Sequence, residues 1–324
     1  MPTNHTDKFI FFHKLIFILV ILFLRLISFG QDFPMSQFYS NLVILNPAFA
    51  GTTGEDRVNM FYRNQWLTTS AGYHAFGVAY DRSFTDINSG AAVILTNEIN
   101  GAYITPTIDL AYSYMIMAAP HLYLSMSVQA GVTQKFLSVS GLQFQHPGEN
   151  ITNGFSKIIP DFTFGVVGFY RDNLYFGTSI DHITVPYQGI TRSANEMIQR
   201  KFTAFFGFLY YYRTHLISEQ RVLSPNIIVQ IQGLQYNINW GASFQYNSLV
   251  GGIWIRHNFK PDFDAVILSA GIKTKDYKFA YSYDVNIGKR TTIPLGAHEI
   301  SFTMRFKSYK KKKYKTFKCP KFLD

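Results

Sequence analysis

The chain has 324 residues, of which 47% are hydrophobic, 17% aromatic and only 15% charged. About a quarter of the residues of a soluble globular domain are charged. The formal net charge of +10 is terminal: residues 1–30 carry +2, residues 307–324 carry +7, and about +1 is left for the 276 residues between them. The charge therefore does not indicate a nucleic-acid partner, and the single cysteine, Cys319, excludes an internal disulfide and a four-cysteine metal site.

Residues 1–30 are typical of a secretory signal peptide. Lys8 and Lys14 precede the apolar run 15–24, and small residues at 28 and 30 suit signal peptidase. We expect cleavage after Gly30. The alternative is a membrane anchor, but Arg25 leaves the run shorter than the roughly 20 apolar residues of a spanning helix.

Residues 31–57 form a lead-in without strand alternation. A flexible periplasmic linker is one interpretation, but Phe38, Tyr39 and Phe49 make the segment too aromatic for a free chain. We expect this periplasmic N-terminal segment to pack into the mouth of the domain that follows.

Residues 58–306 repeat a two-residue alternation of apolar and polar side chains. The clearest case is 236–246, where Trp240 and Phe244 share one face while Asn239 and Ser243 share the other. Successive strand residues point to opposite faces, so this pattern indicates strands with one apolar face. A single such strand would also suit a soluble sandwich, but the repetition favours a membrane wall.

We predict fourteen strands, most of them about as long as a tilted strand that crosses a bilayer. They lie at 58–66, 72–82, 89–98, 107–117, 121–135, 161–171, 173–182, 201–213, 222–232, 235–246, 249–257, 264–274, 278–286 and 297–306.

The predicted fold class is all-β: a transmembrane antiparallel β-barrel of about 14 strands in the outer membrane. Closure is expected because an unpaired backbone group in hydrocarbon costs several kcal/mol. The connections after even-numbered strands are mostly short, and several after odd-numbered strands are long, as in barrels with both termini in the periplasm. We therefore predict a multi-pass barrel with its long loops outside.

No enzymatic, cofactor or metal motif is evident. The nine histidines form no paired-ligand spacing, and no nucleophile elbow or phosphate-binding loop is found. Ser179, Asp181 and His182 are the nearest set to a catalytic cluster. Adjacent strand residues face opposite sides, so Asp181 cannot readily orient His182. We predict no enzymatic activity and no cofactor.

Residues 307–324 form a basic C-terminal tail that we expect in the periplasm. A solvated, disordered tail is the plain interpretation. The alternative is a docking arm for an acidic periplasmic partner or for anionic headgroups. The candidate docking residues are Lys310, Lys311, Lys312, Lys313, Lys315 and Lys318.

Several motifs along the chain resemble the PorP/SprF family of type IX secretion system membrane proteins from Bacteroidetes. They are Gln31-Asp-Phe-Pro-Met-Ser-Gln-Phe-Tyr39, Asn46-Pro-Ala-Phe-Ala-Gly51, Tyr62-Arg-Asn-Gln-Trp66, Gly177-Thr-Ser-Ile-Asp-His182, His298-Glu-Ile-Ser-Phe302 and Lys318-Cys-Pro-Lys-Phe322. Lys321 stands where Arg is common in the family, and Leu323-Asp324 follows Phe322.

The resemblance implies a non-enzymatic outer-membrane barrel that assists the export or surface attachment of a secreted adhesin with a type IX C-terminal domain. Gliding motility and adhesion are the associated processes. The implied partners are the secreted protein, the lipid bilayer and, for some members, periplasmic type IX or peptidoglycan-binding components. An outer-membrane porin or small-molecule transporter is the alternative, because the same alternation would produce one.

Overall fold

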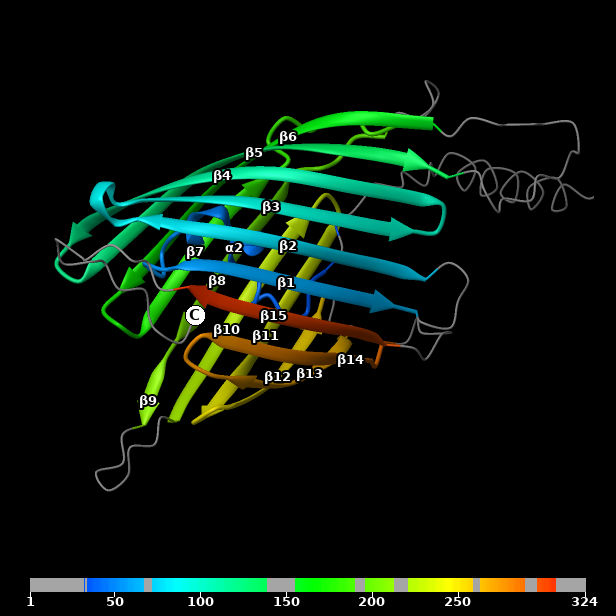
Figure 1. Cartoon of the computed structure of the whole chain (residues 1–324). Helices are drawn as coiled ribbons and strands as arrows, with labels where there is room; N and C mark the ends of the chain where they lie inside the picture. Colours follow the sequence, from blue (N-terminus) through cyan, green and yellow to red (C-terminus); the bar gives the residue numbers. More distant parts are fainter. Residues whose placement is uncertain are drawn as a thin grey trace, which may run out of the picture.

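The computed structural model describes residues 32, 34–66, 72–138, 155–189, 196–212, 221–258, 263–288 and 296–306. They form one antiparallel sheet that curls into a ring (Figure 1). Its strands are β1 (Asp56–Gln65), β2 (Tyr73–Phe84), β3 (Ser89–Asn100), β4 (Tyr103–Ala119), β5 (Leu122–Leu137), β6 (Phe155–Tyr170), β7 (Leu174–Asp181), β8 (Lys201–Phe208), β9 (Tyr210–Tyr212), β10 (Arg221–Gln232), β11 (Gln235–Tyr246), β12 (Leu249–His257), β13 (Phe263–Lys273), β14 (Tyr277–Asn286) and β15 (Ala297–Phe306).

The first and last strands close the ring. β1 pairs with β15 from Asp56↔Phe306 to Gln65↔Ala297, and β10 pairs with β11 along its whole length. β8 and β9 both pair with β10, so they are two pieces of one barrel strand. The predicted barrel of about fourteen antiparallel strands is confirmed.

The alternation in the sequence matches the two faces of the wall. On β11, Trp240 and Phe244 are exposed on the outer face, whereas Asn239 and Ser243 are buried on the inner face. Most of the exposed large apolar side chains occupy such outward positions, where lipid would cover them. The polar side chains therefore line the lumen.

Strand ends differ most from the prediction in two places, and the other ends lie within two residues of it. β4, β5 and β6 extend further than expected, over 17, 16 and 16 residues. The strand expected over 201–213 is broken at Leu209. There the backbone N–H donates to Asn173 O at 2.7 Å, outside the ladder, and the side chain is fully buried. Packing of this leucine inside the barrel accounts for the break.

The two ends of the barrel differ in their connections. One end holds the connections 138–154, 182–200 and 287–296, and we refer to it as the long-loop end. The other end holds the turns at 120–121, 171–173, 247–248 and 274–276, and we refer to it as the short-turn end. β1 begins and β15 ends at the short-turn end.

Residues 34–55, referred to below as the plug, lie inside the ring (Figure 1). The plug contains α2 (Leu42–Leu45) and the 3-10 turn η1 (Pro47–Phe49); a second 3-10 turn, η2 (Thr85–Ile87), links β2 to β3. Within the described ranges, no helix is long and apolar enough to span a membrane.

The plug runs the length of the lumen. Asp32, just before it, contacts Lys201 and Gln232 at the long-loop end, whereas Gly51 lies against Gly90 near the short-turn end. The sequence predicts that the lead-in packs into the mouth of the barrel, but the segment continues past the mouth where β1 begins to the long-loop end. Polar wall residues bind the segment along its whole path. Asp32 therefore lies at the long-loop end, opposite Phe306 at the short-turn end.

Candidate functional site in the barrel lumen

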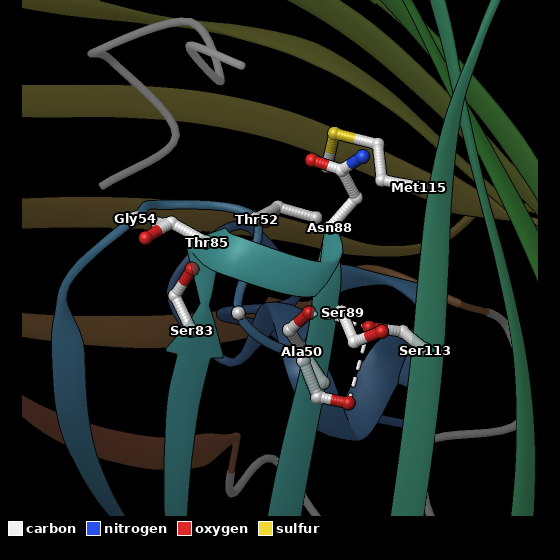
Figure 2. A pocket seen from close by; sticks show the side chains of 11 residues that line it. Ala50, Thr52, Gly54, Ser83, Thr85, Asn88, Ser89, Ser113 and Met115 are labelled. Carbon is white, nitrogen blue, oxygen red and sulfur yellow. Dashed lines mark hydrogen bonds between the residues drawn. The ribbon is translucent and has the colours of Figure 1, made fainter. Parts of the chain in front are cut away.

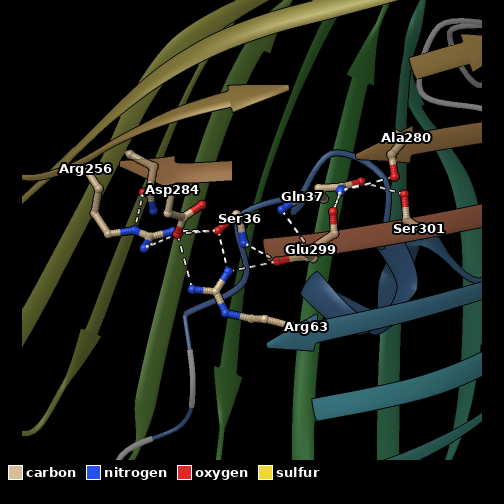
Figure 3. A network of polar contacts seen from close by, with 9 residues as sticks. Ser36, Gln37, Arg63, Arg256, Ala280, Asp284, Glu299 and Ser301 are labelled. Carbon is tan, nitrogen blue, oxygen red and sulfur yellow. Dashed lines mark hydrogen bonds and ion pairs between the residues drawn. The ribbon is translucent and has the colours of Figure 1, made fainter. Parts of the chain in front are cut away.

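A buried ion network holds the first part of the plug (Figure 3). Ser36 N–H donates to Glu299 Oε2 at 2.8 Å, and the Ser36 hydroxyl donates to Asp284 Oδ2 at 2.7 Å. Arg63 pairs with Glu299 at 3.1 Å and with Asp284 at 3.2 Å, and Arg256 pairs with Asp284 at 2.9 Å. Two arginines thus balance two carboxylates, which is how charges are tolerated in an interior.

Gln37 extends this network along β15. Its backbone N–H donates to Glu299 Oε1 at 3.0 Å, its side-chain amide donates to Glu299 O at 2.7 Å, and it accepts from the Ser301 hydroxyl at 2.5 Å (Figure 3). We refer to Ser36, Gln37, Arg63, Arg256, Asp284 and Glu299 as the anchor network. Its four ionised side chains are at most 5% exposed.

Aromatic side chains pack the middle of the plug against the wall. Tyr39 stacks on Trp254 with ring centroids 4.5 Å apart, and Phe49 stacks on Phe205 at 5.5 Å. Burying a side chain of this size contributes about 1.5–3 kcal/mol. Burial also raises the pKa of Tyr39 above its ordinary value, with Glu299 and Asp284 adding to the rise, so this phenol is neutral.

Asn46 fixes the turn at the centre of the plug. Its side-chain oxygen accepts from Ala48 N–H at 2.9 Å and caps η1, where Pro47 can take the first position without losing a hydrogen bond. Its amide nitrogen donates to Thr178 O at 2.9 Å on β7. One side chain therefore shapes the plug and joins it to the wall.

Close backbone contacts hold the last part of the plug (Figure 2). The Ser113 hydroxyl donates to Ala50 O at 2.7 Å, and Gly51 N–H donates to Asp81 Oδ2 at 2.9 Å. Gly51 adopts φ +67°, and a Cβ on Gly90 would lie 2.2 Å from Ala50 O. The cavity left beside these residues is about 30 Å³, the volume of one water molecule.

A second charged group holds the chain where it enters the plug. Asp32 accepts from Lys201 Nζ at 2.6 Å and pairs with His182 Nε2 at 3.1 Å. His182 Nδ1 pairs with Asp161 at 2.7 Å, and Lys201 also contacts Asp181 at 3.2 Å. We refer to these five residues as the rim network. Its side chains are 15–27% exposed.

The rim network shifts the pKa of two groups that lie outside the strands. Burial alone would raise the pKa of Asp32, but Lys201 and His182 hold it well below its usual range. Burial alone would lower the pKa of His182, but the carboxylates of Asp32 and Asp161 raise it to about 10. Both groups are therefore charged at neutral pH.

The structure describes some of the candidate site residues that the sequence singles out and not others. His182 pairs with Asp161 and Asp32, not with Ser179 or Asp181, so the three do not form a hydrogen-bonded triad. Within the described ranges, no His, Cys, Asp or Glu group could hold a metal ion. The signal peptide and the basic tail, with Lys310, Lys311, Lys312, Lys313, Lys315 and Lys318, lie outside the described residues.

The motifs that first suggested a family converge on the plug. Ser36 and Gln37 belong to the first motif and Asn46 to the second, and they bind Arg63, Thr178 and Glu299 from three others. None of these residues is predicted from the sequence to hold the plug. The available signal was an ionised residue on the polar face of a strand, as at Arg63, Arg256, Asp284 and Glu299.

Comparisons with known proteins agree with the fold and identify a family. The family model described as type IX secretion system membrane protein PorP/SprF matches residues 27–304. A search of curated proteins found no match.

Solved barrels match the chain at low sequence identity. The P. putida toluene transporter TodX is 11% identical with a TM-score of 0.51, covering 83% of this chain and 95% of its own. The CymD monoaromatic hydrocarbon channel is 10% identical, with a TM-score of 0.49 and coverages of 87% and 96%. The KdgM porin is 8% identical, with a TM-score of 0.39 and coverages of 77% and 99%.

Proposed function

Because the chain belongs to the PorP/SprF family of type IX secretion system membrane proteins, we propose that it assists the export or surface attachment of a secreted adhesin. The client would carry a type IX C-terminal domain, and gliding or adhesion would be the process served. In this role the barrel is a docking component and performs no chemistry.

The single observation that carries the proposal is the filled lumen. The plug contacts β15 through Gln37, β7 through Asn46 and β4 through Ala50, so it bridges the wall on several sides. A barrel closed by its own chain supplies a rigid surface and not a passage for solutes. This supports docking over the alternative, a porin or small-molecule transporter. In that alternative the plug would have to leave the lumen before solutes could cross.

Sidedness is part of the proposal. We place the short-turn end in the periplasm and the long-loop end outside, as is usual for bacterial barrels. Residues 307–324 follow Phe306 at the short-turn end. Their lysines, Lys310 to Lys313, Lys315 and Lys318, would meet an acidic periplasmic component there. The long loops would meet the client.

Co-purification tests the client. The tagged barrel is isolated from its native membrane, and bound proteins are identified by mass spectrometry. We expect a secreted protein with a type IX C-terminal domain to be retained. Isolation of the barrel without such a protein, together with normal surface display of the adhesin in a deletion strain, would contradict the proposal.

Deletion of residues 307–324 tests the tail separately. We expect the barrel to assemble normally, because no described wall residue is removed, while surface display of the client falls. A variant with the tail lysines replaced by glutamine separates charge from length. Unchanged display in both variants would end the docking role of the tail.

A further inference from the structure

A cavity of about 550 Å³ lies in the lumen between the plug and the long-loop end. Ile44 and Leu45 of the plug form part of its floor, and residues of β3 to β8 and of β10 form most of its sides. A cavity of this size holds a small molecule or a few residues of peptide. We refer to it as the chamber.

The lining of the chamber is acidic. Six carboxylates line it against two lysines and His182: Asp32, Glu98, Asp109, Asp161, Asp181 and Glu196. The cations are largely engaged already. Lys201 contacts Asp32 and Asp181, and Lys135 donates to Gln188 while lying 4.9 Å from the centroid of the Tyr103 ring. Even with His182 charged, the lining has six carboxyl groups against three cationic side chains.

Two of these carboxylates form a pair across a glycine. Asp109 on β4 and Asp161 on β6 both register with Gly131 on β5. A Cβ on Gly131 would lie 1.8 Å from Asp109 Oδ1, so the Asp109 carboxylate lies over the glycine, on the side of β6. Asp161 Oδ2 binds His182, but its Oδ1 is buried and has no hydrogen-bond partner among the described residues.

No cation of the described chain bonds to Asp109, whose hydrogen-bond donor is Gln129. Asp161 pairs with His182 on one oxygen only and Asp109 bonds to no cation of the described chain, so the two carboxylates can attract a further positive charge. Fewer than three possible metal ligands converge here within the described ranges. The apolar side chains Ile94, Ile159 and Ile228 line the chamber as well, which suits a cation on an aliphatic stem.

We propose that the chamber binds a lysine or arginine side chain of a protein segment that enters from the long-loop end. Its ammonium or guanidinium group lies between Asp109 and Asp161, and its stem packs on the apolar floor. The chain's own lysine tail follows Phe306 at the opposite end, and we assign the segment to another protein. The inference goes beyond the proposed function and does not require that the segment belong to a secreted client.

The test uses calorimetry on the whole purified barrel in detergent. The probes are acetyl-Gly-Lys-Gly-amide, acetyl-Gly-Arg-Gly-amide, the norleucine peptide as a neutral match for lysine, and spermidine as a free amine. We expect the two basic peptides to bind, with the norleucine peptide at least about tenfold weaker, as for the loss of a partly buried charge pair. Equal binding of the norleucine peptide would overturn the proposal without any variant.

Variants locate the site. Asp109→Asn should weaken binding of the basic peptides about tenfold, and the double variant Asp109→Asn/Asp161→Asn should abolish it. Asp86→Asn is the matched control, because this exposed aspartate lies in η2 at the short-turn end. Unchanged hydrogen exchange of the plug shows that each variant is folded.

Gly131→Ala gives a second approach to the pair, because its Cβ displaces the Asp109 carboxylate without changing any charge. We expect it to weaken peptide binding while the plug stays protected. Binding of the basic peptides to the double variant at wild-type affinity would contradict the proposed site. If spermidine binds and neither basic peptide does, the ligand is a free amine and the proposal that it belongs to a protein segment is wrong.

Discussion

The anchor network and the rim network hold neighbouring parts of the same chain, yet their surroundings differ. The ionised side chains of the anchor network are at most 5% exposed, and each carboxylate faces an arginine. Those of the rim network are 15–27% exposed and border the chamber. Buried pairs are strongly destabilising when one partner is removed, whereas exposed pairs contribute little. We therefore expect the anchor network to hold the plug in place, and the rim network to contribute less to the stability of its first residues.

The largest effect is expected for Glu299→Ala. It leaves the backbone N–H groups of Ser36 and Gln37 without their buried acceptor, and it removes one of the two carboxylates that pair with Arg63. Plug release should become easier by about 3–5 kcal/mol, measured as faster hydrogen exchange over 36–46. Asp86→Ala, an exposed change of the same charge, is the control. Unchanged exchange in Glu299→Ala would show that the network does not hold the plug.

A smaller effect is expected for Gly90→Ala. Its Cβ would lie 2.2 Å from Ala50 O, so the plug and β3 must move apart. We expect the free energy of unfolding to fall by about 1–3 kcal/mol. This is measured as lower thermal stability and as faster hydrogen exchange near residue 50. Gly251→Ala is the control, because its nearest neighbour would be 3.6 Å away. Equal losses in the two variants would contradict a tight contact at Gly90.

Lys201→Met tests the rim network. It removes the cation shared by Asp32 and Asp181, but these side chains are partly exposed, so water replaces much of the interaction. We expect the free energy of local opening to fall by about 1 kcal/mol. Hydrogen exchange should become faster at residues 34–37 alone. A loss as large as that of Glu299→Ala would remove the distinction between the two networks.

A further prediction concerns the pH dependence of the rim network. The pKa of His182 is raised to about 10, so its stabilisation is complete below its unfolded value of about 6.5 and is lost as pH rises through about 10. The pKa of Asp32 is lowered, so its stabilisation is present above about 3.9 and is lost in acid.

Protection of residues 34–37 should therefore be greatest between about pH 4 and 6.5. Hydrogen exchange, corrected for its intrinsic pH dependence, measures it. His182→Gln should flatten the alkaline side only. A flat profile in the wild-type chain would contradict charge pairing at the rim.

The sequence was enough to predict the wall but not what fills it. β11, β12 and β15 begin and end where alternation placed them, because period two assigns every side chain to lipid or lumen. The long-range pairing of Ser36 with Glu299 and Asp284 is set by three-dimensional closure, which local patterns do not encode. The polar face at Arg63 or Glu299 indicated a lumen, and it looked the same whether water or a plug occupied it.

Conductance across a planar bilayer tests the central claim, that the plug closes the barrel and makes it a docking component. Wild-type protein is compared with Glu299→Ala and with a variant lacking residues 34–51. We expect no steady open current from the wild type, rare openings from Glu299→Ala, and a large continuous current from the deletion. A wild-type current equal to that of the deletion would contradict the claim and favour a diffusion pore.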